Sequence, residues 1–206
     1  MKILVILAHP DRKSFNHAIA LAAVEALTDS GHEAVFHDLH DEAFPPVITS
    51  EEIPKGARLD PVIEQHCREL AEAEGIVIVH PNWWGQPPVI LKGWVDRVVR
   101  PGVAYEFRED DSGEGVPVGL LKAKSAVVFN TSNTYPEREL AAFGDPLERS
   151  GKTASLASAG SAISTAKPTG SSSPAPPPSG LSGWRMSKPL SGGCFRPDRK
   201  PRDRHP

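Results

Sequence analysis

The chain of 206 residues is predicted to be an α/β protein with a doubly wound parallel sheet. Three observations predict this class. Apolar runs of strand length occur at 2–8 and 75–80, and a further strand is predicted at 123–130. Such runs are typical of strands that are covered on both faces. Segments with the apolar spacing of helices alternate with these runs, and that alternation is typical of a parallel sheet.

The first part of the chain supplies three strands and two helices in this interpretation. Residues 2–8 form the first strand, and the Ala- and Leu-rich residues 16–27 form a helix that Ser14 or Asn16 is suited to start. Residues 33–38 form a second strand after the turn at Ser30-Gly31, whereas residues 39–59 are polar and show no clear period. Residues 60–73 are expected to be helical, and residues 75–80 form the third strand.

A second stretch of elements follows the third strand. A helix is expected with most of its apolar residues on one side, and Trp94 is assigned to the core. A loop at 101–117 carries Tyr105 and Phe107 among acidic residues, and residues 123–130 form the fourth strand. The apolar residues of the helix are Val89, Leu91, Trp94, Val95, Val98 and Val99.

Polar residues between the first strand and the first helix form a candidate anion site. A helix N-terminus offers backbone N–H groups and the positive end of the helix dipole. The alternative is that Ser14 only caps the helix and that His9 is a surface residue. The segment matches neither the Walker motif nor the Gly-rich dinucleotide fingerprint.

An aromatic loop follows the third strand and is expected to form a flat, partly apolar surface. Trp83 and Trp84 are followed by Gly85 and by two prolines. Ligands of open parallel sheets bind at the carboxyl edge, and a flat surface suits a planar ring system. The alternative is that both tryptophans pack in the core, but adjacent residues of a loop rarely face one core.

These stretches resemble the flavodoxin-like NAD(P)H:quinone oxidoreductases, a group that includes ancillary flavoproteins of potassium-efflux systems. The matching segments are HPDRKSFN at 9–16, HPNWWGQPPVILKGWVDRVVRPG at 80–102, the overlapping LKGWVDRVVRPGVAYEF at 91–107, and TSNTYPE at 131–137. The resemblance extends from residue 1 to about residue 149 and implies a flavodoxin-like doubly wound parallel sheet.

The resemblance also implies which residues hold a flavin. The loop after the first strand would hold its phosphate, the aromatic loop would line the isoalloxazine edge mostly through backbone atoms, and the loop after the fourth strand would close over the other side. Tyr135 is a weak candidate for assisting hydride transfer and is equally well a surface tyrosine, so no catalytic residue is assigned. The cofactor-binding set is His9, Ser14, Phe15, Asn16, Pro81, Asn82, Trp83, Trp84, Gly85, Thr131, Ser132, Asn133 and Tyr135.

By the same resemblance, the expected reaction is hydride transfer from NAD(P)H through the flavin to a quinone or another small acceptor. FMN is favoured over FAD, and a homodimer is expected if the fold is complete. The alternatives are a regulatory flavoprotein subunit bound to a potassium-efflux transporter, or an inactive truncated product. Two cysteines favour a reducing cytoplasm, and no apolar run reaches the length of a membrane span.

No metal site is expected. The histidines before the tail show neither HxH nor HExxH spacing. His37 and His40 lie three residues apart where a strand runs into a polar loop, so both are expected to be solvated.

The composition changes after Arg149 and divides the chain into a flavin-binding domain at 1–149 and a tail at 150–206. Residues 1–150 carry a formal charge of −10, whereas residues 151–206 carry +7. The tail is of low complexity, basic and expected to be disordered. Its basic end, RPDRKPRDRHP at 196–206, is a weak alternative candidate for a nucleic-acid arm, because it lacks interleaved aromatic residues.

A shift of reading frame near Ser150 would explain this change. Serines encoded by TCN give shifted codons with T in the middle, which specify apolar residues, and three such serines stand at 171–173. On this hypothesis the printed chain lacks the fifth strand and last helix of the fold. A weakened fold, aggregation or poor flavin retention would follow, because the fourth strand would be an exposed edge.

Overall fold

The computed structural model describes residues 1–54, 56–107, 117–144, 146–147 and 162–166. These residues form a central sheet of five parallel strands in the order β2-β1-β3-β6-β7. The direction of winding reverses between β1 and β3, and such a reversal is where ligands bind in open α/β sheets. The strands are β1 (Lys2–Leu7), β2 (Glu33–Asp38), β3 (Gly75–Pro81), β6 (Ser125–Thr131) and β7 (Ala162–Ala166).

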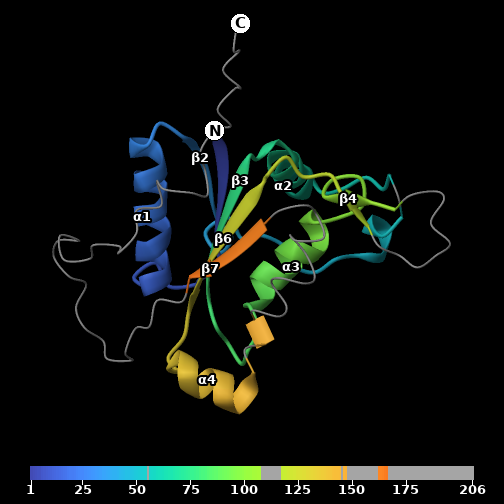
Figure 1. Ribbon diagram of the computed structural model, residues 1–206. Coiled ribbons are helices and arrows are strands. Elements are labelled where there is room, and N and C mark those ends of the chain that lie inside the picture. Colours follow the sequence, from blue (N-terminus) through green and yellow to red (C-terminus); the bar gives the residue numbers. More distant parts are fainter. Residues whose placement is uncertain (55, 108–116, 145, 148–161, 167–206) are drawn as a thin grey trace, which may run out of the picture.

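Helices cover both faces of the sheet, which explains why its inner strands are apolar throughout. Helix α1 (Phe15–Asp29) lies on one side, and α2 (Pro61–Glu72) and α3 (Val89–Val98) lie on the other (Figure 1). Alternate residues of β1 therefore enter two separate cores: Leu4 and Ile6 pack toward α2 and α3, whereas Val5 packs toward α1. The doubly wound sheet expected from the sequence is confirmed.

The predicted helices and strands up to residue 131 are present, and their ends are shifted by at most two residues. Trp94 is fully buried in the core beneath α3, as expected. The assignment of Val89 to the apolar face is wrong, because Val89 is exposed and its neighbour Ile90 is buried instead. The helix begins at Val89 directly after Pro88, so its first side chain projects beyond the sheet.

The expectation that the fifth strand is missing is also wrong. Residues 162–166 form β7, which pairs in parallel with β6 from Ser125↔Ala162 to Phe129↔Ala166. Two β-branched residues, Ile163 and Thr165, favour an extended backbone here, and the edge of β6 offers hydrogen-bonding groups that a short strand can satisfy. The expected last helix and the tail after residue 166 lie outside the described residues.

Several short elements were not expected from the sequence. Strand β4 (Tyr105–Glu106) pairs with β5 (Val118–Gly119) as an antiparallel ribbon, and a single 3-10 turn, η1 (Ser50–Glu52), interrupts the polar segment after β2. Helix α4 (Pro136–Phe143) begins at a proline and ends at Gly144. All are two to eight residues long, which is too short for a periodic pattern.

The segment that contains η1 is fixed to α3 by a buried ion pair. Arg97 Nε donates to Glu52 Oε2 at 2.9 Å, and the same guanidinium contacts the carbonyl of Pro45. Gly93 faces this segment as well, since a Cβ at Gly93 would lie 2.2 Å from the Pro46 carbonyl oxygen. The close approach of Pro46 therefore requires glycine at position 93.

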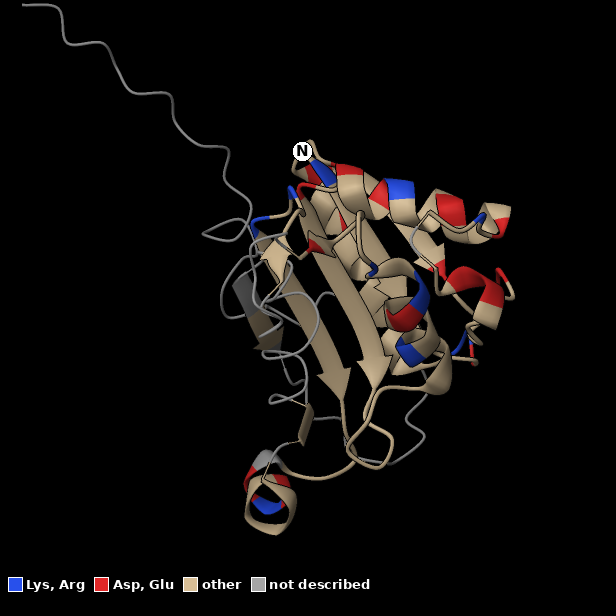
Figure 2. Cartoon of the chain, turned by 90° about the vertical axis from the view of Figure 1, so that its right-hand side faces the viewer, with Lys and Arg blue, Asp and Glu red and all other residues tan. Residues whose placement is uncertain are grey.

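Charged residues gather on the helices and connecting segments. In the view of Figure 2 the strands at the middle of the molecule are almost wholly free of them, as expected of a sheet covered on both faces.

None of the helices among the described residues combines the length and the apolar character needed to cross a membrane.

Candidate functional site

Three loops meet at the carboxyl edge of the sheet and are joined by hydrogen bonds. The side chain of Asn16 in α1 donates to Thr131 Oγ1 at 3.0 Å. The backbone N–H of Asn82 donates to the Thr131 carbonyl at 2.7 Å. The loops after β1, β3 and β6 are thus held together around Thr131, as the sequence analysis expects of neighbouring strand ends.

The loop after β1 presents the N-terminus of α1 at this edge. Ser14 is the N-cap, and its Oγ accepts a hydrogen bond from the His17 backbone N–H at 3.2 Å. Asp11 Oδ1 accepts from the Lys13 N–H at 2.8 Å and so shapes the turn before the helix. The first turn of α1 contains no acidic residue, so no carboxylate of that turn neutralises the positive end of the helix.

His9 is half-buried in the same loop, and its orientation fixes the position of its proton. Its Nδ1 accepts a hydrogen bond from the Asp11 backbone N–H at 3.1 Å, so the neutral ring carries its proton on Nε2. Burial lowers the pKa of His9 and favours this neutral ring. His9 can therefore serve as a neutral hydrogen-bond donor at the start of the site.

The aromatic loop forms a two-residue hairpin turn. The backbones of Trp83 and Gln86 exchange two hydrogen bonds of 3.0 and 3.1 Å, and the residues between them, Trp84 and Gly85, have φ of 58° and 72°. Positive φ at both central positions is the signature of a type I′ turn. A tryptophan rarely adopts this conformation, so the backbone at Trp84 is strained.

Both tryptophans of this turn are outside the core, as the sequence predicts. Trp84 is fully exposed at the tip, and Trp83 is 45% exposed. The ring of Trp83 meets the ring of His9 edge-on, with centroids 6.1 Å apart. Two of the predicted loops therefore contribute neighbouring rings to one surface.

Asn82 anchors the turn and uses its side chain to do so. Its Oδ1 accepts from the Gly85 N–H at 2.9 Å, and its amide nitrogen donates to the Glu139 carboxylate of α4. Glu139 is buried, and sequence reasoning missed it because α4 was not predicted. A buried carboxylate needs a hydrogen-bond partner, and no local pattern in the sequence identifies Asn82, 57 residues away, as that partner.

The loop after β6 contributes short polar side chains. Ser132 Oγ accepts from the Thr134 N–H at 3.2 Å, which shapes a tight turn before α4. Tyr135 precedes α4 and is 69% exposed, so its hydroxyl is accessible. Pro81 is buried at the end of β3, and its carbonyl oxygen lies 2.9 Å from His80 Nδ1.

The expectation that both His37 and His40 are solvated is wrong for His37. His40 is exposed, but His37 is buried at 6% exposure. Glu69 of α2 and Glu42 contact the two ring nitrogens of His37 and satisfy them inside the protein. The first of these partners lies 32 residues away, beyond the reach of local spacing.

A family model described as having a flavodoxin-like fold matches residues 1–151 of the chain. The match ends next to the position where the composition changes.

Curated relatives include proteins named as NAD(P)H oxidoreductases. An "Uncharacterized NAD(P)H oxidoreductase" of Haemophilus influenzae is 35% identical over 134 residues, which are 64% of each chain. "NAD(P)H dehydrogenase [quinone] 1" of Rattus norvegicus is 35% identical over 125 residues, which are 52% of this chain and 46% of the rat protein. The matched part thus spans about half to two thirds of the length of these relatives.

Solved structures share the fold. An NAD(P)H:quinone oxidoreductase from Methanothermobacter marburgensis superposes with a TM-score of 0.68 at 24% identity, covering 82% of this chain and 84% of that one. An FMN-dependent NADH-azoreductase from Bacillus anthracis, solved with FMN, gives a TM-score of 0.63 at 18% identity, covering 81% and 86% of the two chains.

Proposed function

The chain belongs to the flavodoxin-like family that includes the NAD(P)H:quinone oxidoreductases, and on this basis we propose that it is a flavin-dependent reductase. In the proposed reaction, hydride passes from NAD(P)H to a quinone or a similar acceptor. The observation that carries the proposal is the convergence of three polar and aromatic loops at one edge of the sheet, next to the N-terminus of α1.

The residues at this edge fit a flavin nucleotide at both of its ends. The N-terminus of α1, with Ser14 at its cap and no acidic residue in its first turn, is suited to a phosphate. His9 adds a neutral N–H donor nearby. The exposed aromatic loop offers a flat surface for a planar ring, and the hydroxyl and amide groups at 131–133 offer hydrogen bonds for its polar edge.

When bound, a flavin supplies the two-electron chemistry, and the protein supplies binding and orientation. Asn16 and Asn82 hold the three loops in register through Thr131, so each loop is positioned before a ligand arrives. Trp83 and His9 limit the position of a ring from one side. Tyr135 is exposed at the start of α4, where its hydroxyl can meet a second substrate.

The proposal also covers the kind of flavin, the cellular compartment and the oligomeric state. FMN is preferred to FAD, since the phosphate loop is built while the region expected to hold an adenylate follows residue 149. A reducing cytoplasm suits the buried free thiol of Cys67. A homodimer would cover apolar side chains exposed around the carboxyl edge, which are Trp84, Val89, Tyr135, Leu140 and Phe143. No observation on the described residues favours a transporter partner.

Reconstitution of the full chain tests the proposal. The purified protein is mixed with FMN or FAD, unbound flavin is removed, and the bound flavin and the oxidation of NADH and NADPH with a quinone are measured. We expect tight binding of flavin and turnover with at least one donor. A folded chain that retains neither flavin contradicts the proposal.

Two variants and a control sharpen this test. Trp83→Ala and His9→Ala remove neighbouring rings of the site, and each should weaken flavin binding about tenfold or more, equivalent to about 1.4 kcal/mol. Leu21→Ala removes an exposed apolar side chain on α1 and should leave the affinity unchanged. Equal loss in all three variants would show that the effect is one of folding.

A further inference from the structure

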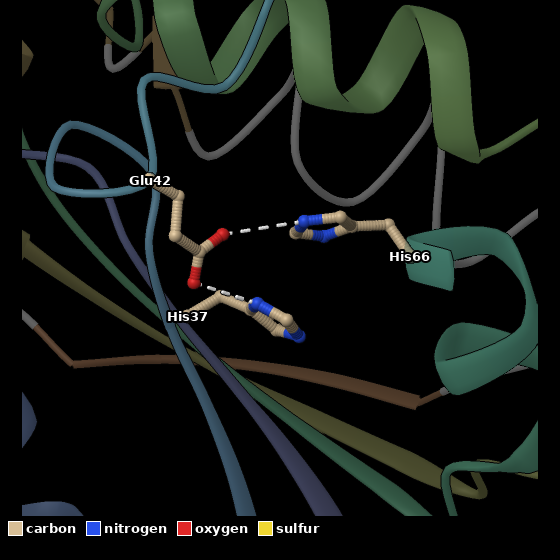
Figure 3. Close-up of side chains that lie close together, drawn as sticks. All are labelled: His37, Glu42 and His66. Atoms are coloured by element: carbon tan, nitrogen blue, oxygen red, sulfur yellow. Dashed lines mark hydrogen bonds and ion pairs between the residues drawn. The ribbon is translucent and has the colours of Figure 1, made fainter. Parts of the chain in front are cut away.

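We propose that His37, Glu42 and His66 form a binding site for a divalent transition-metal ion, with Zn²⁺ as the ion that best suits their chemistry. Their ligand atoms lie within 4.8 Å of one another. Figure 3 shows the Glu42 carboxylate beside the two imidazole rings, with one oxygen directed toward each. The three residues come from the end of β2, from the loop after it and from α2.

The two short distances in the cluster end on different oxygens of Glu42, so an ion held by one of these oxygens requires the carboxylate to shift. Glu42 Oε1 lies 2.8 Å from His37 Nδ1, and Glu42 Oε2 lies 3.3 Å from His66 Nε2. Ligands of a tetrahedral Zn²⁺ at about 2.1 Å are themselves separated by about 3.4 Å. Two imidazoles and a carboxylate are typical donors for zinc, and they leave a fourth position for water.

The surroundings of His37 are those of a metal-binding histidine. Its second nitrogen, Nε2, lies 2.6 Å from Glu69 Oε2. A carboxylate on the far nitrogen orients the ring of a metal-bound histidine and strengthens it as a ligand. Both rings are buried, whereas the Glu42 side chain is 33% exposed, so Glu42 marks the side from which an ion can enter.

The surroundings of His66 oppose metal binding and give the proposal a specific test. Trp94 Nε1 donates to His66 Nδ1 at 3.1 Å, which places the proton of the neutral ring on Nε2, facing Glu42. A metal on Nε2 requires this proton to move to Nδ1 and the bond from Trp94 to break. The indole N–H thus competes with the metal, and its removal should strengthen binding.

An ion at this position would join three elements on the α2 side of the sheet. It would hold the loop after β2 against α2, close to the segment that the Arg97–Glu52 pair fixes to α3. The site is built from residues that the proposed flavin site does not use. Either proposal can therefore fail while the other stands.

Calorimetric titration of the chelator-treated full chain with Zn²⁺ tests the site. We expect one ion per chain, and binding weakened at least tenfold by Glu42→Gln and by His66→Gln. His40→Gln is the matched control, since His40 is exposed and three residues from His37. Because Glu42 is partly exposed, its variant should fold even if the histidine variants do not.

Two further measurements decide between a metal site and a purely hydrogen-bonded cluster. Trp94→Phe should tighten Zn²⁺ binding, whereas in a hydrogen-bonded cluster without a metal it changes only stability. The proposal is overturned if Zn²⁺ does not bind, or if binding survives Glu42→Gln and His66→Gln. It is equally overturned if Cys194→Ser abolishes binding, because the ion then lies elsewhere in the chain.

Discussion

Trp84 is the most unusual residue of the site, because it combines a left-handed backbone with full exposure. A strained and fully exposed residue does not stabilise the fold, and a residue that favours this turn would serve the fold better. We therefore infer that the Trp84 side chain has a function. We predict that Trp84→Asn leaves the free energy of unfolding unchanged or raises it by about 1 kcal/mol, since Asn-Gly is the preferred type I′ pair. Urea denaturation monitored by circular dichroism measures this change.

The same variant should lose function. Flavin or acceptor binding should weaken, because a flat apolar surface is removed from the aromatic loop. Gly85→Ala serves as the contrast: Gly85 also has positive φ, and a Cβ there would lie 2.7 Å from Pro146 Cγ, so this change should destabilise the turn. A clear drop in the stability of Trp84→Asn would mean that Trp84 is packed.

His37 and Glu42 make stability depend on pH in opposite directions. The raised pKa of His37 gives a contribution that is complete below its usual value of 6.5 and is lost as the pH rises through the folded value. For Glu42, burial raises the pKa but His37 and His66 lower it more, to about 2, so its contribution is complete above 4.5 and is lost as the pH falls toward 2.

We therefore predict that the free energy of unfolding falls less steeply with rising pH in His37→Gln than in the unchanged protein. Urea midpoints measured between about pH 6 and 9 test this, because the difference between the two proteins should shrink as His37 loses its proton. The prediction is wrong if the difference is constant across this range. The titration is done in chelator, so that bound metal cannot contribute.

At the scale of single residues, the sequence predicts positions better than partners. The exposure of Trp83 and Trp84 could be predicted because adjacent residues in a loop cannot both face one core. The burial of His37 could not, because it depends on Glu69, which only folding brings into contact. The left-handed backbone at Trp84 is set by the hydrogen bonds between Trp83 and Gln86, and tryptophan itself does not favour it.

Among the elements, α3 and the segment before α2 depend on one buried ion pair. Arg97 and Glu52 are both nearly fully buried, and removal of one partner leaves an unpaired charge. Arg97→Met should lower the free energy of unfolding by about 3–5 kcal/mol. The double variant Arg97→Met/Glu52→Gln should recover part of this loss. Chemical denaturation of all three proteins checks the prediction, and a double variant no more stable than the single one contradicts it.

Most elements of more than five residues could be predicted, because they have a helical period or a largely apolar run of strand length, and α4 is an exception. Residues 3–7 and 75–79 are apolar throughout, since helices cover both of their faces. Helix α4 has eight residues and carries three glutamates or arginines in its first four positions after Pro136, so its apolar pattern is weak. Its place in the site comes from the contact of Glu139 with Asn82.

At the scale of the whole molecule, β7 satisfies the backbone hydrogen-bonding groups of β6 that would otherwise be exposed. In a parallel pair, alternate residues of an edge strand bond to their neighbour, and proline removes the N–H group. We predict that, of Ile163→Pro and Ser164→Pro, one lowers the free energy of unfolding by about 3 kcal/mol and the other by much less. Equal effects of the two, measured by thermal unfolding, would argue against the pairing of β6 with β7.

A shifted reading frame near residue 150 stays a prediction. The family model ends at residue 151, next to the position of the predicted shift. We predict that sequencing of the coding DNA around codon 150 reveals an insertion or deletion, and that the frame-corrected chain retains more flavin than the printed one. An intact frame would refute it. The expected loss of the fifth strand follows from the departure from the family pattern and from the frameshift hypothesis, and it is wrong because residues 162–166 pair with the open edge of β6.

The bond between Asn16 and Thr131 joins residues that are 115 positions apart. During synthesis, therefore, β1 and α1 leave the ribosome long before the loop after β6 does. Contacts of such long range form late, because the intervening chain must first be ordered. Before the loop after β6 has folded, a cofactor could contact only the loops after β1 and β3. Binding of the cofactor should therefore be among the last steps in the folding of this protein.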